Sequence, residues 1–376
     1  MKHELVRYLN AHRPVESIKR TVVTITIACC SLPVIAHGAT PAESGLLHTA
    51  TIIQLMRKVN DYQQAHPWKE RSRWIPATFY MGVMALYETT EDLAILDQAL
   101  RWAQENQWAE GQEKEPSNRM TCGQTYLQLY FIKKDPAMIA KMKAFIDRQI
   151  ASGVPARKAW WYCDALYVAS PTLAMMTRAT DDNRYLDYLH KMYWDVTDYL
   201  FSRKYGLFYR DETYFDAQTS NGKKVFWARG NGWVIASIPR VLRYLPTNDP
   251  DYTRYVRLYR ALASSISKVQ GKDGLWRSNL ADANQFPNPE TSSTAFFCYA
   301  LAAGINDGHL PRKPYRNVAV RAWEGLASMV QPDGKLGYVQ GVASEPGPAS
   351  ADMTQEYAMG IFMLAGTEII RLVENR

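Results

Sequence analysis

Phe226-Trp227-Ala228-Arg229-Gly230-Asn231-Gly232-Trp233 is followed by a mostly apolar run that reaches Leu242. The two glycines predict a tight bend, and asparagine is a residue type that caps helices, so we expect a buried helix to begin at Asn231. The bend would hold Trp227, Arg229 and Trp233 at one helix entrance. An arginine between indole rings suits a planar, anionic ring, because its guanidinium binds a carboxylate while the indoles stack. The alternative is a capped core helix with a structural arginine.

Segments of the same kind recur along the chain, each with a polar loop that runs into a helix apolar on nearly all sides. We place their starts at six positions, which are Ala77, Gly123, Cys163, Asn231, Ser293 and Met353. Amphipathic segments with a single apolar stripe alternate with them, for example at Leu93, Leu96, Leu100 and Ala103, and at Tyr255, Leu258, Leu262 and Ile266.

An inner helix must bury all its faces, whereas an outer helix buries only one stripe. With a first helix in 40–66, six segments of each kind predict an all-α fold, a closed double ring of six inner and six outer helices. Few segments alternate with period two, so any sheet is small. Pro239, inside the fourth inner helix, predicts a kink or an early end there.

The loops before the inner helices would gather at one mouth of the ring. Helix N-termini carry partial positive charge and free N–H groups, so the mouth would favour an anion. Five tryptophans fall in these loops or in the first turns after them, and they predict an aromatic-lined site for sugar rings: Trp160, Trp161, Trp227, Trp233 and Trp276.

Composition limits the classes of partner. The chain is 47% hydrophobic over 376 residues, enough for a sizeable core. Its net charge is +7, of which residues 1–39 carry +3 (five Lys/Arg less two Asp/Glu), so about +4 remains for the rest. No Lys/Arg block dominates, which argues against nucleic acid. None of the seven histidines falls in the mouth loops, and Cys122, Cys163 and Cys298 lack close spacing. We therefore expect no metal site and no disulfide scaffold.

The N-terminus has the pattern of an export signal. Lys19-Arg20 precede an apolar run from Thr21 to Ala36, and small residues follow up to Ala39. We interpret 1–39 as the signal segment and 40–376 as a single domain, placed in the periplasm or secreted and free of the membrane after cleavage. A membrane anchor is the alternative, although the run is short for a span. The oligomeric state stays open.

Trp160-Trp161-Tyr162-Cys163-Asp164 leads into the third inner helix and holds the candidate catalytic group. A carboxylate among aromatic rings near a helix start is a candidate acid/base, because burial raises its pKa and the helix terminus lowers it. The alternative for Asp164 is a helix cap, a role that we also assign to Glu290 and Asp352. Arg210, just upstream of the Trp/Arg turn, is a candidate second contact to a carboxylate.

These motifs together resemble a known family. FWARGNGW, WWYCDALYVASP, GQTYLQLY, DGLWRSNL and ETSSTAFFCYALAAGI are similar to the unsaturated rhamnogalacturonyl hydrolases, glycoside hydrolase family 105, which are related to the family 88 unsaturated glucuronyl hydrolases. The resemblance covers roughly residues 45–372. It implies an (α/α)6 barrel, an enzyme without cofactor or metal, and an unsaturated uronyl oligosaccharide as the partner.

The resemblance also implies roles for single residues. Asp164 matches the acid/base that protonates the C4=C5 double bond of the sugar and then assists the attack of water at C5. Trp227, Arg229 and Trp233 match positions that hold the unsaturated ring and its carboxylate, and Trp161 and Gln124 lie in motifs that we assign to substrate binding. The chain departs from the family at Asn118-Arg119, where an acidic pair is usual, and Arg119 is placed to meet a negative group on the substrate.

Three hypotheses follow. The first is a hydrolase that removes a 4,5-unsaturated galacturonic acid from the non-reducing end of rhamnogalacturonan or pectin oligosaccharides. The second is an unsaturated glucuronyl hydrolase that acts on other polysaccharide-lyase products. The third is a catalytically silent sugar-binding protein on the same ring, which would not need Asp164.

Overall fold

The computed structural model of the 376-residue chain describes residues 45–67 and 73–375. The predicted export segment at 1–39 lies outside these residues and stays a prediction. Of the helices in the described ranges, none combines the length and the apolar composition that crossing a bilayer requires.

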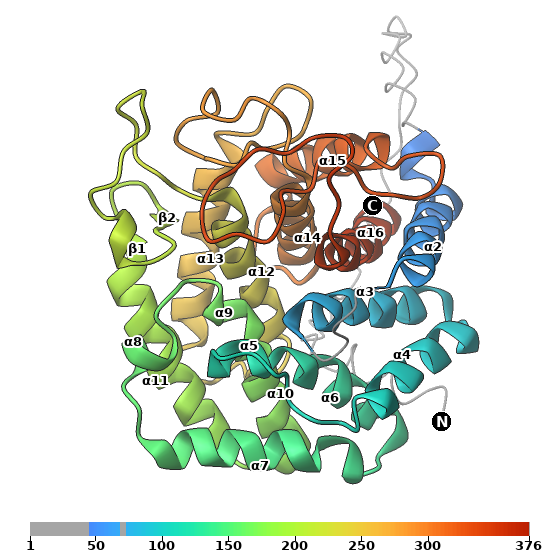
Figure 1. The fold of residues 1–376 in the computed structure, drawn as a ribbon, viewed down its shortest axis with the longest axis vertical. Helices are drawn as coiled ribbons and strands as arrows, with labels where there is room; N and C mark the ends of the chain where they lie inside the picture. Colours follow the sequence, from blue (N-terminus) through green and yellow to red (C-terminus); the bar gives the residue numbers. More distant parts are fainter. Residues whose placement is uncertain (1–44, 68–72, 376) are drawn as a thin grey trace, which may run out of the picture. The chain divides into compact units, whose positions relative to one another are not determined.

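Six long helices form a closed inner ring in the described part of the chain (Figure 1). Each packs against the next one along the chain, and the last packs against the first. They are α3 (Trp74–Thr90), α6 (Thr121–Lys133), α10 (Ser170–Thr180), α12 (Ala228–Leu242), α14 (Thr291–Asn306) and α16 (Glu356–Glu374). The short α9 (Ala165–Val168) precedes α10, from which Ala169 alone separates it. The predicted helix starts lie within a few residues of these.

Six outer helices alternate with the inner ones and pack on the outside of the ring. They are α2 (Thr49–Ala65), α4 (Leu93–Glu105), α7 (Ala137–Ser152), α11 (Arg184–Leu200), α13 (Tyr252–Ser267) and α15 (Arg312–Ser328). The predicted all-α double ring of six inner and six outer helices is thereby confirmed. The minor elements are η1 (Gly45–Leu47), α5 (Pro116–Arg119), α8 (Ala156–Ala159), η2 (Glu212–Tyr214), and the antiparallel pair β1 (Phe201–Ser202) and β2 (Leu207–Phe208).

Burial distinguishes the two rings as their sequences predict. In α14 every residue from 291 to 304 is buried, whereas α13 buries one stripe that contains all four predicted positions. On α4 the predicted stripe is confirmed at Leu96 and Ala103, which are buried, but not at Leu93, which is 72% exposed. Trp102 is buried beside the stripe and stacks on Tyr80 of α3 at 4.4 Å.

Ring closure depends on two glycines. A Cβ atom on Gly82 of α3 would collide with the backbone of Gly360 in α16, and the converse substitution would collide with α3 at Thr78 and Phe79. The first and last inner helices therefore approach backbone to backbone, which only residues without a side chain allow.

Several inner helices begin at the same end of the ring, which we call the mouth. Trp74, at the start of α3, lies 5.7 Å from Trp233 of α12 and 5.3 Å from Tyr357, near the start of α16. The connection from α15 to α16 runs across this face (Figure 1). At the other end, α12 continues past Pro239 only to Leu242, so it ends within a turn of the proline.

Candidate active site

Asp164 directly precedes α9, and a backbone hydrogen bond fixes the chain at this point. The N–H of Cys163 donates to the carbonyl of Arg210 at 2.8 Å, which ties the Trp160–Asp164 stretch to the residues after β2. Asp164 occupies the N-cap position of α9, but its side chain makes no capping hydrogen bond. The capping alternative is therefore not what the structure shows. The carboxylate instead lies 3.9 Å from Nε of Arg210 and 3.8 Å from Sγ of Cys163.

The surroundings of Asp164 change its acidity. Burial raises the pKa of Asp164 to about 6, since the charged form loses hydration. The positive charges of Arg210 and Arg229 lower that pKa, and the carboxylate of Asp211 raises it. The side chain keeps 13% of its surface exposed. A carboxyl group in this state holds a proton at mildly acidic pH and releases it near neutrality, as one group acting as both acid and base must do.

Arg210 is the charged partner nearest to Asp164. Its guanidinium lies over the rings of Trp161 at 4.5 Å and Tyr162 at 4.8 Å. Nη1 binds Asp211 at 2.6 Å, while the buried Nε has no hydrogen-bond partner among the described residues. The structure thus places Arg210 beside Asp164 and leaves its Nε–H without a hydrogen-bond partner in the described part of the chain, while the predicted contact of Arg210 with a carboxylate of the substrate stays a prediction.

The Gly-Asn-Gly segment is not the predicted bend. The helix α12 begins at Ala228, so both glycines and Asn231 lie in its first turns. Asn231 does not cap the helix but binds the backbone of Phe208 through both ends of its amide, at 2.8 and 3.0 Å. Gly230 serves close approach instead, because a Cβ there would lie 3.1 Å from Trp227, 3.2 Å from Cys163 and 3.7 Å from Asp164. The glycine lets α12 pack directly on the Asp164 segment.

Arg229 binds the protein rather than an open space. Nη1 donates to the carbonyl of Gln340 at 2.7 Å and to the hydroxyl of Tyr357, and Nη2 donates to the carbonyl of Gly341 at 2.9 Å. The side chain is 1% exposed. These contacts favour the structural alternative, in which Arg229 fastens the connection before α16 to the mouth, and the carboxylate clamp stays a prediction. Its charge still acts on Asp164.

The tryptophans differ from the expectation of an aromatic-lined mouth. Trp227 and Trp233 are 2% and 3% exposed, so neither offers a free indole face. Trp227 donates its Nε1–H to Oε1 of Gln340 at 3.0 Å, and Trp233 packs 4.3 Å from Phe296. Trp160 and Trp276 are buried as well. Of the five predicted tryptophans, Trp161 alone is exposed, at 43%.

Gln124 and Arg119 also form hydrogen bonds within the protein. Gln124 is fully buried, donates to the carbonyl of Tyr167 at 3.0 Å and accepts from Arg240 at 2.8 Å. It belongs to the wall between inner helices and not to a ligand site. Arg119 donates to the carbonyl of Gly111 at 2.8 Å and to Glu110 at 3.0 Å, so its charge is balanced within the chain.

The sequence did not predict several residues that connect parts of the site lying far apart along the chain. The hydroxyl of Tyr162 donates to Oδ1 of Asn118 at 2.7 Å, which ties the departure from the family pattern to the ring beneath Arg210. Gln340 links Trp227, Arg229 and Glu290 through its side chain and backbone. Glu290 caps α14 as predicted, whereas the predicted cap Asp352 is exposed and lies before the N-cap of α16.

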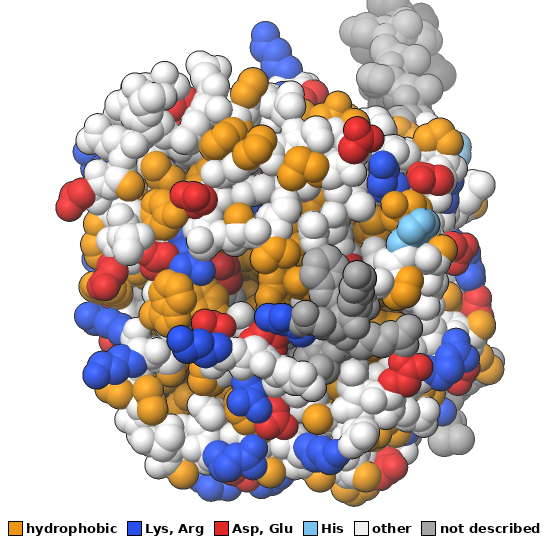
Figure 2. All heavy atoms as spheres, viewed as in Figure 1, with side chains coloured by type: hydrophobic (Ala, Val, Ile, Leu, Met, Phe, Trp, Pro, Cys, Tyr) orange, Lys and Arg blue, Asp and Glu red, His pale blue; other side chains and the backbone are white. Residues whose placement is uncertain are grey.

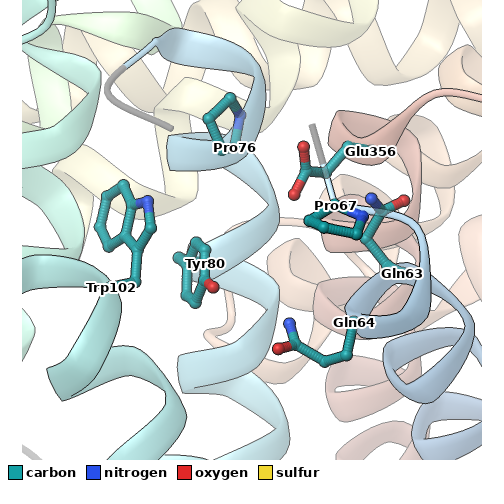
Figure 3. A pocket seen from close by; sticks show the side chains of 7 residues that line it. All are labelled: Gln63, Gln64, Pro67, Pro76, Tyr80, Trp102 and Glu356. Carbon is teal, nitrogen blue, oxygen red and sulfur yellow. The ribbon is translucent and has the colours of Figure 1, made fainter. Parts of the chain in front are cut away.

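At least two cavities lie among the described residues. One of about 150 Å³ adjoins Trp161 and Asp211. A second, of about 30 Å³, holds at most a few waters and is lined by side chains of α2, α3, α4 and α16 together with Pro67, as Figure 3 shows. On the face shown in Figure 2 the surface is hollowed near its centre, with hydrophobic, acidic and basic side chains at the border.

A cluster of potential metal ligands lies away from Asp164. Among the described residues, His190 stands 3.7 Å from Asp249 and 3.4 Å from Asp251. The two aspartates lie between the end of α12 and the start of α13, at the opposite end of α12 from Arg229. The cluster has no connection to the Asp164 site, and the expectation of a reaction without metal or cofactor stays a prediction.

Comparison of the sequence with known proteins identifies relatives of this chain. A sequence profile described as Glycosyl Hydrolase Family 88 matches residues 49–373. A Formosa agariphila protein named unsaturated 3S-rhamnoglycuronyl hydrolase is 32% identical over 356 residues, covering 89% of this chain and 94% of its own length. A protein of the same name from an Alteromonas species is 34% identical over 322 residues, covering 79% of this chain and 77% of its own.

A solved structure agrees with the sequence comparisons. The glycosyl hydrolase family 88 protein from Bacteroides vulgatus matches with a TM-score of 0.81 at 30% identity, over 86% of this chain and 99% of that one. The family resemblance seen in the motifs is thereby confirmed. The chain belongs to glycosyl hydrolase family 88, and it is a glycoside hydrolase of the unsaturated uronyl hydrolase type.

Proposed function

We propose that the protein removes a 4,5-unsaturated uronic acid from the non-reducing end of an oligosaccharide in which that residue is attached to rhamnose. The observation that carries the proposal is the Asp164 carboxyl group, which has a pKa raised to about 6 and makes no capping bond to its own helix. A group in this state is suited to proton transfer near neutral pH.

The proposed chemistry begins with proton donation. Protonated Asp164 gives its proton to C4 of the double bond, which leaves a cation at C5 that the ring oxygen stabilises. Water attacks C5, and the Asp164 carboxylate takes a proton from that water. The product is a hemiketal at C5, which opens to a ketone, and the aglycone then leaves from C1 as an alcohol. Asp164 is regenerated in its protonated form, so one carboxyl group serves both steps.

Arg210 supports this cycle by its charge. Its Nε lies 3.9 Å from the Asp164 carboxylate without a hydrogen bond to it. Once Asp164 has lost its proton, the guanidinium stabilises the negative charge. The uncommitted Nε–H is also available to the carboxylate of the sugar, which is the second contact predicted for Arg210.

The galacturonyl and glucuronyl hypotheses predict the same unsaturated sugar at the non-reducing end. Galacturonic and glucuronic acid differ at C4, and lyase elimination makes C4 trigonal, so both give the same unsaturated ring. The remaining differences lie in the anomeric bond and in the aglycone. The names of the two curated relatives combine rhamnose with a uronyl group, and the motif resemblance points to a rhamnogalacturonyl substrate, so rhamnose is the aglycone common to both.

The test uses purified protein and a defined disaccharide with an unsaturated uronyl residue on rhamnose. We expect the ultraviolet absorbance of the conjugated double bond to disappear while free rhamnose is released in equal amount. The Asp164→Asn variant is the matched control and should bind the disaccharide without turnover. Turnover by neither anomer of the disaccharide would overturn the proposal, and binding without turnover by the wild-type protein would favour the sugar-binding alternative.

We also propose that the chain is exported, with 40–376 as the mature catalytic domain. The support is the basic pair Lys19-Arg20, the apolar run and the small residues that follow. Mass spectrometry of the protein recovered outside the cytoplasm should find an N-terminus near residue 39. A chain that retains Met1 and stays with the cytoplasmic fraction would contradict this.

A further inference from the structure

The cavity of about 150 Å³ lies between α8, the end of α11 and the residues that begin η2. A cavity of this size accepts one six-membered ring. Its lining includes the indole of Trp161, which is 43% exposed, whereas the lining residues Val196 and Leu200 are each only 1% exposed. The exposed indole suits the apolar face of a 6-deoxyhexose.

The cavity is next to the Asp164 carboxyl group, with one guanidinium between them. Trp161 and Asp211 both line the cavity, and both contact Arg210, at 4.5 Å from the indole and 2.6 Å from the carboxylate. Arg210 in turn stands 3.9 Å from Asp164. The cavity is thus separated from Asp164 by the Arg210 side chain, and the second sugar of a disaccharide is the ligand that we assign to it below.

The charged residues around the cavity bear on whether it binds a neutral or an anionic sugar ring. Arg157 lines it, but Asp195 binds that guanidinium through both oxygens at 3.2 Å, and the guanidinium lies over the ring of Tyr199 at 4.4 Å. Asp211 is likewise balanced by Arg210. Both cations near the cavity are therefore already paired within the protein.

Glu212 also lines the cavity and is the charged residue there that has no ion-pair partner among the described residues. Its Oε2 accepts a hydrogen bond from the hydroxyl of Tyr199 at 2.5 Å, and Glu212 forms no ion pair with a described residue around the cavity. A carboxylate accepts hydrogen bonds from sugar hydroxyls and repels a sulfate ester in the same place.

We propose that this cavity is the aglycone subsite, in which Trp161 stacks on a neutral 6-deoxyhexose and Glu212 accepts a hydrogen bond from one of its hydroxyls. The protein accordingly prefers an unsulfated rhamnose over a sulfated one. This inference rests on the proposed function and adds the substrate class of the second sugar.

The first experiment compares two disaccharides, one with rhamnose and one with rhamnose 3-sulfate as the aglycone. The wild-type protein should have a kcat/KM about tenfold higher for the unsulfated compound. Glu212→Gln keeps the oxygen that Tyr199 binds and removes the charge, so it should reduce the preference to about threefold or less, mainly through faster turnover of the sulfated compound. A wild-type preference for the sulfated disaccharide, or an unchanged ratio in the variant, overturns the inference.

The second experiment separates stacking from an indirect effect through Arg210. Trp161→Ala should raise KM for the disaccharide several-fold and leave the methyl glycoside of the unsaturated uronic acid, which has no second ring, unaffected. Equal losses on both compounds would show that Trp161 acts on Asp164 and would overturn the subsite. Leu93→Ala, an exposed apolar side chain on α4, is the control and should change neither compound.

The two proposals fail in different ways. If the wild-type protein turns over none of the three compounds, the proposed function fails and the subsite fails with it. If it turns them over with no dependence on Glu212 or Trp161, only the subsite is wrong. Thermal melting of each variant confirms that it is folded before rates are compared.

Discussion

Nε of Arg210 lies 3.9 Å from Oδ2 of Asp164, and Nη1 of the same guanidinium binds Asp211 at 2.6 Å. The arginine is thus anchored by one carboxylate while it faces another that it does not hydrogen-bond. Its effect on Asp164 is therefore electrostatic. The proton on Asp164 can leave and return without breaking a hydrogen bond to Arg210, which suits a group that must change its charge twice in each turnover.

The charge of Arg210 should determine the upper pH limit of activity. Asp164 must be protonated to act as the acid, so kcat/KM should fall as the pH rises through the pKa of about 6. Arg210 lowers this pKa, so Arg210→Gln should move the limit to higher pH by about 1 unit. Arg210→Lys keeps the positive charge and should move it less. A pH profile measured for the three proteins checks this, and an unmoved limit in Arg210→Gln would refute it.

Asp164→Asn should stop catalysis and stabilise the protein. Loss of the acid/base group should lower kcat by about 10²–10⁴-fold, with the affinity for the disaccharide largely kept. The folded-state pKa of Asp164 is about 6 against an ordinary value of 3.8, so the folded protein binds more protons between these values and loses stability as the pH rises through them.

Above that window the ionised group costs at most about 3 kcal/mol, and the asparagine does not carry this cost. We therefore expect Asp164→Asn to raise the free energy of unfolding by about 1–3 kcal/mol at pH 7.5 and to change it little at pH 4. Denaturant unfolding at both pH values measures the difference. A variant that is less stable than wild type at pH 7.5 would contradict the assigned pKa direction.

Arg229 should contribute mostly to stability and to the order of the mouth. Its two terminal nitrogens bind the carbonyls of Gln340 and Gly341, and its side chain is 1% exposed. Arg229→Ala leaves these buried carbonyls without their donors and should lower the free energy of unfolding by about 2–4 kcal/mol. Proteolysis should then cut near residues 341–345. If stability is unchanged and only the affinity for the uronic acid falls, the carboxylate clamp was the correct interpretation.

Gly230→Ala should lower catalysis more than Gly45→Ala, a substitution at a glycine with open space around it. The new Cβ would stand 3.1 Å from Trp227, 3.2 Å from Cys163 and 3.7 Å from Asp164, so the Asp164 segment must shift by a few tenths of an ångström. We expect kcat to fall by about tenfold, since small misplacements of a catalytic group are costly. Gly45→Ala, which meets no atom within 4 Å, is the control. Equal activities of the two variants would show that the fit at Gly230 does not matter.

The fold could be predicted from the sequence because burial differs so clearly between the two kinds of helix. A mostly apolar segment such as α14 is stable only inside the ring, and the regular alternation then leaves few arrangements. The exposure of Leu93 and the burial of Trp102 on α4 were not predictable, because Trp102 stacks on Tyr80 of another helix. Periodicity marks an apolar face only approximately when a large aromatic residue lies at its edge.

The site was predictable where the signal is local and not where it depends on distant partners. Asp164 and Arg210 could be named from their own surroundings in the sequence. Whether Arg229 faces a ligand or the protein depends on Gln340 and Gly341, more than 110 residues away. Glycine is favoured both in a tight turn and where two helices approach closely. The glycines of the FWARGNGW segment therefore do not show from the sequence alone which of these two structures they form.

The glycine contact between α3 and α16 has a consequence for biosynthesis. The first inner helix can make its contact with α16 only after Gly360 has been translated, which is later than the other inner helices. We therefore expect the ring to stay open until α16 has been synthesised. Tyr357, which accepts a hydrogen bond from Arg229, arrives in the same final helix. A chain released before Gly360 would carry Asp164 and Arg210 and still lack an assembled mouth, so we expect catalytic competence to require the synthesis of α16.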